Sequence, residues 1–431
     1  MADQSKNDLP DVKIEGDVVD SSIVIGNNNV VNNIRNIIFR DTKQLAIFIV
    51  TVLLVAGGIT FSIWYSLQPR RMTGNFNIAV AQFGEITENG SVQSSARAEK
   101  ISSTLFNFLD SEYRASGLGL SVQVAHQNMP LIIEDAQAEE LAKKINADIV
   151  IYGNVYVQGD QAEFSPRFYV AQQADVNELT GQNELAFPIR FDVSQLGSQD
   201  KVNAELRTRT EILFNFTKGL IYFSQKDDLS AFSVTQAAIK SAENLNFKGK
   251  EALYLFASKI QLNQKNYAAA NQFLDRALEI NSAYARAYLM RGNIFYLQAL
   301  DANFDPDLLN QAMIQYEAAY QSPEQPEGAY IPVKAHTAFG NILVIIAQQK
   351  NDRGLFAKAI EHYKFVTEQF ERTRDPAIQG HASIAYFGLG AAYERQDNLE
   401  QAVEAYQKAF ELTTDQDFQT RIQQKIKDLG K

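Results

Sequence analysis

Residues 383–412 read SIAYFGLGAAYERQDNLEQAVEAYQKAFEL, and small and large residues recur in this stretch at helical intervals. Counted from Gly390, the positions +3, +12, +16 and +19 are Tyr393, Ala402, Tyr406 and Ala409. Small residues at Gly390 and Ala402 allow two antiparallel helices to touch, and the tyrosines fill the space beside that contact. The stretch therefore predicts a helical hairpin with a short polar turn between its helices.

The same intervals recur less regularly upstream, which indicates that one helical hairpin is repeated along the chain. We expect five such units, two of which carry insertions near residues 301–307 and 348–354. A polar capping helix is expected at residues 419–429. The repeated positions upstream are, unit by unit, Gly219, Tyr222, Ala231, Thr235 and Ala238; Ser258, Ala270, Leu274 and Ala277; Gly292, Phe295, Ala312, Tyr316 and Ala319; and Gly340, Leu343, Ala359, Tyr363 and Val366.

This pattern resembles the tetratricopeptide repeat family over residues 207–429. The resemblance implies an all-α solenoid at residues 205–431, with a groove that binds peptides or segments of partner proteins. The residues that it implies are structural are Gly292, Gly340, Gly390, Tyr393, Ala402, Tyr406 and Ala409. The candidate groove residues are polar side chains on the first helix of a unit, namely Tyr288, Asn293 and Asn341. A merely solvated helix face would carry the same residue types.

A second long feature is the uncharged run LAIFIVTVLLVAGGITFSIWYSL at residues 45–67. About 20 apolar residues suffice for a helix to cross the hydrocarbon core of a bilayer, so residues 44–68 predict a single transmembrane helix. A buried core helix is the alternative, but a core helix of this length usually carries a polar stripe. A cleaved signal peptide is disfavoured, because the run is too long and begins too far into the chain.

The flanks of this run bear on its orientation and on self-association. Arg35, Arg40 and Lys43 precede it and two arginines follow it, which slightly favours a cytoplasmic amino terminus and extracytoplasmic carboxy-terminal domains. The expected location is the cell inner membrane of a bacterium, with the bilayer contacting residues 45–67. The pair Gly57 and Gly58 is compatible with close helix contact, so self-association is a possible property.

The amino-terminal forty residues divide into two parts. Residues 1–11 are polar and predict disorder. Residues 12–34, VKIEGDVVDSSIVIGNNNVVNNI, alternate apolar with small polar residues, which predicts a short β element rich in glycine and asparagine. This segment resembles a short motif found at the front of multi-domain bacterial signalling proteins, where it implies an adaptor role. A glycine-rich juxtamembrane linker is the plainer alternative.

Residues 72–200 predict an α/β layered domain. Strands are expected at 77–83, 121–125, 148–157, 164–170 and 185–193, and helices at 92–113 and 134–145, in the order βαβα followed by a β-meander. The run ADIVIYG at residues 147–153 resembles the amino-terminal domains of the periplasmic Tol-system β-propeller protein and related envelope lipoproteins. That resemblance implies a protein-interaction domain outside the cytoplasm. The fold class is thus multi-domain: a transmembrane helix, an α/β domain and an all-α solenoid.

Composition excludes several functions. The formal net charge is −11, and residues 72–431 hold 33 Lys/Arg and 44 Asp/Glu, so a nucleic-acid partner is disfavoured. The chain has no cysteine, which removes disulfides and thiolate chemistry. The four histidines, His126, His336, His362 and His381, lie at no metal-ligand spacing. We therefore expect no catalytic residues, no cofactor and no metal.

Two functional interpretations fit these features. The first is a membrane-anchored scaffold, not an enzyme, that binds partner proteins or peptides through the solenoid groove. The alternative is a transmembrane sensor, in which the α/β domain binds a small molecule and signals to the amino-terminal element. The sequence itself names neither the partner nor the oligomeric state.

Overall fold

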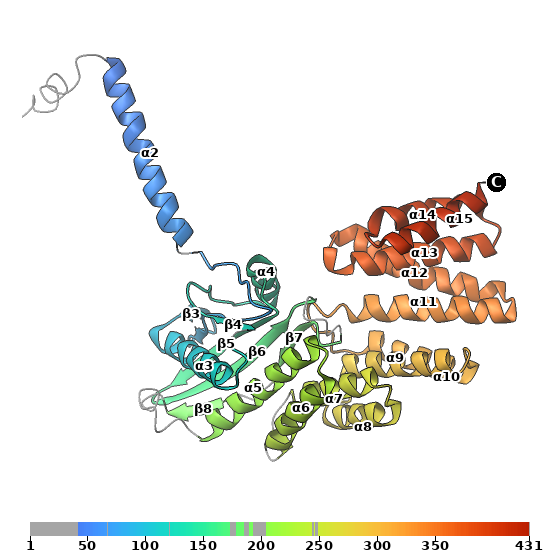
Figure 1. The fold of residues 1–431 in the computed structure, drawn as a ribbon, viewed down its shortest axis with the longest axis horizontal. Helices are drawn as coiled ribbons and strands as arrows, with labels where there is room; N and C mark the ends of the chain where they lie inside the picture. The colour runs from blue at the N-terminus through green and yellow to red at the C-terminus, as the bar shows by residue number, and fades with distance from the viewer. Residues whose placement is uncertain are drawn as a thin grey trace, which may run out of the picture. The chain divides into compact units, whose positions relative to one another are not determined.

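The computed structural model of the 431-residue chain describes residues 42–66, 68–119, 121–172, 178–184, 189–192, 204–243, 245 and 249–430. The predictions for residues 1–11 and 12–34 therefore concern positions outside the described residues. The chain divides into two compact units, Met1–Gln68 and Pro69–Lys431. Figure 1 traces both units from the amino to the carboxy terminus.

The described part of the first unit is dominated by one helix, α2 (Thr42–Ser66), which covers most of the apolar run at residues 45–67. All its described side chains from residue 50 to 60 are exposed, and Leu53 and Leu54 expose 65% and 70% of their surface. The Thr60 hydroxyl donates to the Ala56 carbonyl at 2.9 Å, so even this polar group is satisfied within the helix. These apolar side chains form no protein core, and a bilayer-spanning role for α2 stays a prediction.

Length and hydropathy alone single out one helix among the described residues as able to span a membrane, and it is α11 (Ile331–Lys350), at a hydropathy of 1.2. Half of that window is buried (50%) inside the second unit. We therefore interpret α11 as a core helix of a folded domain. The described apolar stretch of α2, Val50–Thr60, is shorter than such a span.

The second unit begins with a mixed sheet. Its strand order is β3-β2-β5-β1-β4, and β6 pairs with β5, β7 and β8. Two helices, α3 (Ala96–Ala115) and α4 (Asp135–Ile145), interrupt the strands. The strands are β1 (Phe76–Val80), β2 (Gly84–Ile86), β3 (Val92–Ser94), β4 (Val122–Ala125), β5 (Ile149–Gln158), β6 (Gln161–Val170), β7 (Gly181–Glu184) and β8 (Ile189–Asp192).

Strand β1 is buried along its whole length and is parallel to both of its neighbours, β4 and β5. In β1, Ile78 pairs with Val124 of β4 and with Ile149 of β5, both in parallel register. Ile78 and Ile149 belong to the core cluster that includes α3, whereas Ala79 belongs to the cluster that includes α4. Successive side chains of a strand point to opposite faces, so one helix covers each face of the sheet.

The sequence located most of this sheet but missed its short strands. The α/β region is confirmed, with helices near 92–113 and 134–145 and a strand at each of the five expected places. Strands β2, β3 and β7 were not predicted, because runs of three or four residues give no clear period. The last predicted strand, at residues 185–193, corresponds in its described part to β8.

The helical half of the second unit begins with α5 and consists of five helix pairs and a final helix. The pairs are α5 (Ala204–Ser224) with α6 (Asp228–Glu243), α7 (Lys250–Asn263) with α8 (Tyr267–Ile280), α9 (Ala285–Asp301) with α10 (Pro306–Gln321), α11 with α12 (Arg353–Thr373), and α13 (Pro376–Arg395) with α14 (Leu399–Leu412). The last helix is α15 (Gln416–Leu429). This arrangement confirms a helical solenoid of the tetratricopeptide type.

Local sequence explains where several of these helices begin. Asp305, Asp352, Asp375 and Asp415 each accept hydrogen bonds from backbone N–H groups of the first turn, which lack partners within the helix. A proline occupies the first turn of α10, α11 and α13, where its missing N–H costs nothing.

The repeated alanines lie where paired helices touch. Ala231, Ala270, Ala312, Ala359 and Ala402 are all 0% exposed. A larger side chain at these positions would push the two helices of a pair apart. The spacing found in the sequence is thus the spacing of helix contacts.

The sheet and the solenoid share one hydrophobic core. This cluster contains Ile151 of β5 and Phe168 of β6, and it continues through α5 to α9. Phe168 packs edge-on against Phe216 of α5, with ring centroids 5.2 Å apart, and the buried hydroxyls of Tyr113 and Thr217 form a hydrogen bond. The sequence places a domain boundary between residues 200 and 205, and the core extends across it.

Candidate functional site

The first helices of the pairs pack side by side and define a face that we call the first-helix face, lined by α7, α9, α11 and α13. Its geometry depends on a contact repeated in three units. A Cβ at Gly292, Gly340 or Gly390 would lie 2.6 or 2.7 Å from ring carbons of Tyr316, Tyr363 or Tyr406. Each glycine therefore leaves room for a tyrosine of the second helix in its pair.

The hydroxyls of these tyrosines reach back to the first helix. Tyr316 donates to Asn293 Oδ1 at 2.8 Å, and Tyr363 donates to Asn341 Oδ1 at 2.7 Å. Each asparagine directly follows the glycine of its unit. Asn293 and Asn341 were predicted as groove residues, and the structure gives both a structural role as well, because each satisfies a buried hydroxyl.

The third predicted groove residue, Tyr288, has a different role. It is half-buried on α9, and its hydroxyl donates to the Ser282 carbonyl at 2.9 Å. Tyr393, predicted as structural, is partly buried in the core of the last repeat. In that unit Tyr406 donates to Glu394 Oε2 at 2.9 Å in place of an asparagine.

A buried arginine dominates the amino-terminal half of the first-helix face. Arg286 of α9 is 1% exposed. Its guanidinium donates to the backbone carbonyls of Glu178 at 2.6 Å, Thr180 at 2.7 Å and Gln182 at 2.8 Å. Charge-assisted hydrogen bonds of this kind are about twice as strong as neutral ones. Arg286 thus holds an extended segment, residues 178–184, against the solenoid.

The side chain of Glu178 is bound by two further first-helix side chains. Lys259 of α7 forms an ion pair with it at 3.0 Å, and Asn293 of α9 donates to it at 3.4 Å. Glu178 is only 6% exposed. The ion pair is largely removed from water, which makes its partners costly to separate.

The far edge of the same segment packs on the loop between α10 and α11. Gly181 has a φ of +92°, and a Cβ there would lie 2.5 Å from the Glu327 carbonyl oxygen. The Gln182 N–H donates to that carbonyl at 2.9 Å. Glycine is required at this position both by its backbone angle and by the close approach.

Electrostatics identifies a third basic residue on this face. Burial, together with the positive charge of Arg286, lowers the pKa of Lys334 on α11 to about 8, while Glu178 opposes the shift. Burial also lowers the pKa of Arg286. Lys259, Arg286 and Lys334 form what we call the basic column, and its positive charge favours an acidic ligand.

The sequence analysis did not predict these basic residues, although their positions relative to the repeat glycines are regular in part. Lys259 directly follows Ser258, the residue at the glycine position of its unit. Arg286 and Lys334 each stand six residues before the glycine of theirs. Residues with the same offset in different repeats line one face of a solenoid, so aligning the units could have found Arg286 and Lys334. Lys259 has a different offset and would not have been found in this way.

Two histidines that are distant in sequence meet in the structure. His336 of α11 and His362 of α12 approach to 2.9 Å between their Nδ1 atoms. His336 stacks on Tyr320 and Phe365 with ring centroids 4.3 Å and 4.1 Å away. Burial lowers the pKa of His336 to about 4, and it also lowers that of His362.

The surroundings of the histidine pair are aromatic. Among the described residues, no three His, Asp or Glu side chains are grouped so that they could hold an ion. His126 lies elsewhere, with Nδ1 2.8 Å from the Val80 carbonyl oxygen, and His381 is on α13. The pair packs among the aromatic rings of Tyr320, Phe339 and Phe365.

Known proteins share the repeat. The tetratricopeptide repeat family matches residues 383–415. A thermophilic TPR protein of Thermus thermophilus, TTC0263, is 16% identical, with a TM-score of 0.35 over 50% of this chain and 98% of that one. MamA is 18% identical, with a TM-score of 0.33 over 45% and 93%. YrrB, described as a TPR protein with an unusual peptide-binding site, is 18% identical, with a TM-score of 0.33 over 50% and 91%.

No curated protein matches the sequence. The chain carries a tetratricopeptide repeat at residues 383–415. Its other helix pairs repeat the same glycine–tyrosine contact or the same buried alanine. The helical half of the chain is therefore a tetratricopeptide-like solenoid.

Proposed function

We propose that this chain is a membrane-anchored scaffold whose first-helix face binds extended, acidic segments of partner proteins. The observation that carries the proposal is the segment at residues 178–184. Three first-helix side chains, Lys259, Arg286 and Asn293, hold its carbonyls and its Glu178 carboxylate. A face that binds one extended acidic segment has the chemistry to bind another.

Under this proposal the chain's own segment competes with a partner. A partner peptide must displace residues 178–184 or bind next to them. The internal segment has a high effective concentration because it is tethered, so a partner binds tightly only when the internal contact is weakened. Glu178 is the residue to change, since its side chain carries the specific ionic contact.

A labelled peptide ELTGQNE, the sequence of residues 178–184, tests this idea with the full chain in detergent. Fluorescence anisotropy should show tighter binding to Glu178→Ala than to the unaltered protein. Adding Lys259→Ala should abolish the gain, whereas Lys265→Ala, which removes an exposed lysine just beyond the end of the same helix, should not. If the peptide binds none of these proteins, the first-helix face is not a peptide site.

The anchor in this proposal is α2. Its 25 residues form a continuous helix, and its described side chains are exposed, uncharged and mostly apolar. At about 1.5 Å per residue the helix is longer than the roughly 30 Å hydrocarbon core. Deleting residues 44–68 should move the protein from the membrane pellet to the supernatant, and a variant that stays in the pellet would contradict the anchor.

The proposed location is the bacterial inner membrane, with the amino terminus in the cytoplasm and the second unit outside. The flanking charges and the resemblance of residues 147–153 to envelope domains support this side. A carboxy-terminal reporter that is active only outside the cytoplasm tests it. Activity there places the partners among envelope proteins, and activity only in an amino-terminal fusion reverses the proposed orientation.

A further inference from the structure

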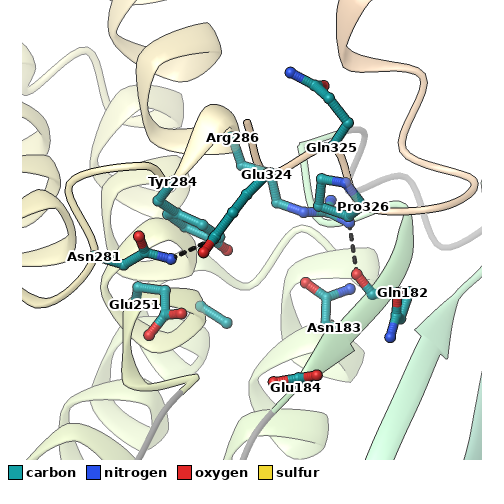
Figure 2. Close-up of a pocket in the computed structure, with 11 residues that line it drawn as sticks. Gln182, Asn183, Glu184, Glu251, Asn281, Tyr284, Arg286, Glu324, Gln325 and Pro326 are labelled. Atoms are coloured by element: carbon teal, nitrogen blue, oxygen red, sulfur yellow. Dashed lines mark hydrogen bonds between the residues drawn. The ribbon is translucent and has the colours of Figure 1, made fainter. Parts of the chain in front are cut away.

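A polar pocket of about 280 Å³ lies where the sheet meets the solenoid. Strand β7 lines one side, and the start of α7, the turn before α9 and the loop after α10 line the rest. Figure 2 shows Glu324 reaching from that loop toward Asn281 and Tyr284. Gln182, Asn183 and Glu184 of the bound segment form part of the pocket wall, but the segment does not fill the pocket.

The pocket is rich in carboxylates that lack a basic partner. Glu184, Glu251 and Glu324 line it, and among the described residues none of them forms an ion pair with a lysine or arginine. The one basic side chain in the described wall is Arg286, which donates to backbone carbonyls of the bound segment. By formal charge the wall carries two negative charges in excess, and burial, assisted by the charge of Glu324, raises the pKa of Glu251 above its ordinary value.

Tyr284 supplies an independent observation. The residue is 7% exposed, and its hydroxyl has no hydrogen-bond partner in the described part of the chain. The nearby charges of Glu251 and Glu324 act on it, since they help burial to raise its pKa. A buried hydroxyl left without a partner is costly, and Tyr284 lines a pocket that a ligand could enter.

We propose that this pocket binds a small aliphatic amine through its protonated ammonium group. The ammonium would donate to Glu251 and Glu324 and to the Tyr284 hydroxyl, and the tyrosine ring offers a favourable face for a cation. An anionic ligand would be repelled by the same carboxylates. A metal ion is disfavoured, because within the described ranges no three ligands converge on one point.

Two of the acidic groups already have partial roles that leave room for this ligand. Glu251, 8% exposed, accepts from the Gly249 N–H at 2.9 Å through Oε2. Glu324 accepts from Asn281 at 2.7 Å through Oε2. Glu251 also accepts from its own backbone N–H and from the Asn281 side chain. A bound ammonium would therefore share these carboxylates with the donors already present, and each carboxylate has about four lone-pair sites to accept hydrogen bonds.

The site would couple two parts of the fold. Its wall combines β7, which belongs to the segment held by Arg286, with α7 and α9 of the solenoid. A bound amine would therefore stabilise the docked state of residues 178–184. This inference does not depend on partner binding at the first-helix face, although it would provide the small-molecule response of the sensor alternative.

Isothermal titration of the full chain in a non-ionic detergent, with putrescine and agmatine as probes, tests the proposal. We expect saturable binding of at least one amine, and none of 1,4-butanediol, which has the same length as putrescine without its charge. Glu251→Gln and Tyr284→Phe should each weaken binding about tenfold. Glu324→Gln, at an exposed position that tolerates change, should weaken it several-fold, and Glu400→Gln on α14 should have no effect.

Two results would overturn the proposal. One is the absence of saturable binding of both amines at millimolar concentration in a protein that melts cooperatively. The other is binding that Glu251→Gln, Tyr284→Phe and Glu324→Gln all leave unchanged. Because Glu324 and the control residue are both exposed, this comparison stays informative even if the buried variants fail to fold.

Discussion

The two halves of the first-helix face are built on the same repeat and carry different side chains. Six residues before the repeat glycine, α9 has Arg286, α11 has Lys334 and α13 has Ile384. Arg286 is 1% exposed under the chain's own segment, whereas Ile384 is 39% exposed. The same glycine–tyrosine contacts set the helix packing in both halves, and the residue at this offset differs between them.

The largest loss of stability should come from removing Arg286, the side chain that holds residues 178–184 on the first-helix face. Arg286→Met deletes three hydrogen bonds and leaves buried carbonyls without partners, so the free energy of unfolding should fall by about 3–5 kcal/mol. Chemical denaturation of the detergent-solubilised chain measures it. A loss below about 1 kcal/mol would mean that the segment at 178–184 contributes little to the fold.

A second variant tests the packing that both halves share. Gly340→Ala places a methyl group 2.7 Å from a Tyr363 ring carbon, and we expect a loss of about 1–3 kcal/mol from overpacking. Gly380→Ala is the matched control, because nothing lies within 4 Å of its added Cβ in α13. Helix propensity should make that control neutral or more stable by up to about 1 kcal/mol. Equal changes in stability from both variants would show that the glycine–tyrosine contact does not determine the effect of Gly340→Ala.

The pair His336 and His362 predicts that the folding stability of the solenoid depends on pH. The folded pKa of His336, about 4, is below the ordinary value of about 6.5 for an unfolded chain. The unfolded state therefore binds protons first, and stability present above pH 6.5 should be lost as the pH falls toward 4. Because both rings are partly exposed, we expect only about 1 kcal/mol between pH 7 and pH 5. Melting temperatures of the protein and of His336→Phe, compared at both pH values, isolate this contribution.

The smallest change in stability should come from placing an arginine on α13, in the half of the first-helix face that residues 178–184 do not cover. Ile384→Arg copies the Arg286 position onto α13, at an exposed site, so stability should change by less than about 0.5 kcal/mol. The same variant should bind the acidic peptide ELTGQNE more tightly than the unaltered chain. Ile384→Gln, a neutral replacement, serves as the control. Identical peptide affinity for both variants would show that the residue six positions before the repeat glycine does not determine which peptide the face binds.

The sequence predicted the parts of this fold that are periodic. Gly292 and Tyr316, or Gly390 and Tyr406, are separated by one helical hairpin, and a helical period places them in contact without further information. Asn293 and Asn341 were found as polar positions for the same reason. Their bonds to tyrosine hydroxyls follow from the same repeat.

The remaining features depend on contacts between distant parts of the chain. Glu178 and Asn293 are 115 positions apart, and Glu178 and Arg286 are 108 apart. No short-range spacing reports such encounters, because they arise only when the solenoid is stacked and the sheet is docked. The short strands β2, β3 and β7 were not predicted for a related reason: their neighbouring strands, and not their own sequence, stabilise them.

The core shared by the sheet and α5 has a consequence for how the solenoid comes apart. Repeat arrays lose their end units first unless a cap protects them. Here the sheet, through contacts such as Phe168 with Phe216, closes the amino-terminal end, while only α15 with one buried residue closes the other. Opening should therefore start at α15 and proceed toward the sheet. Amide hydrogens should exchange in that order, slowest in β5 and fastest in the last helix.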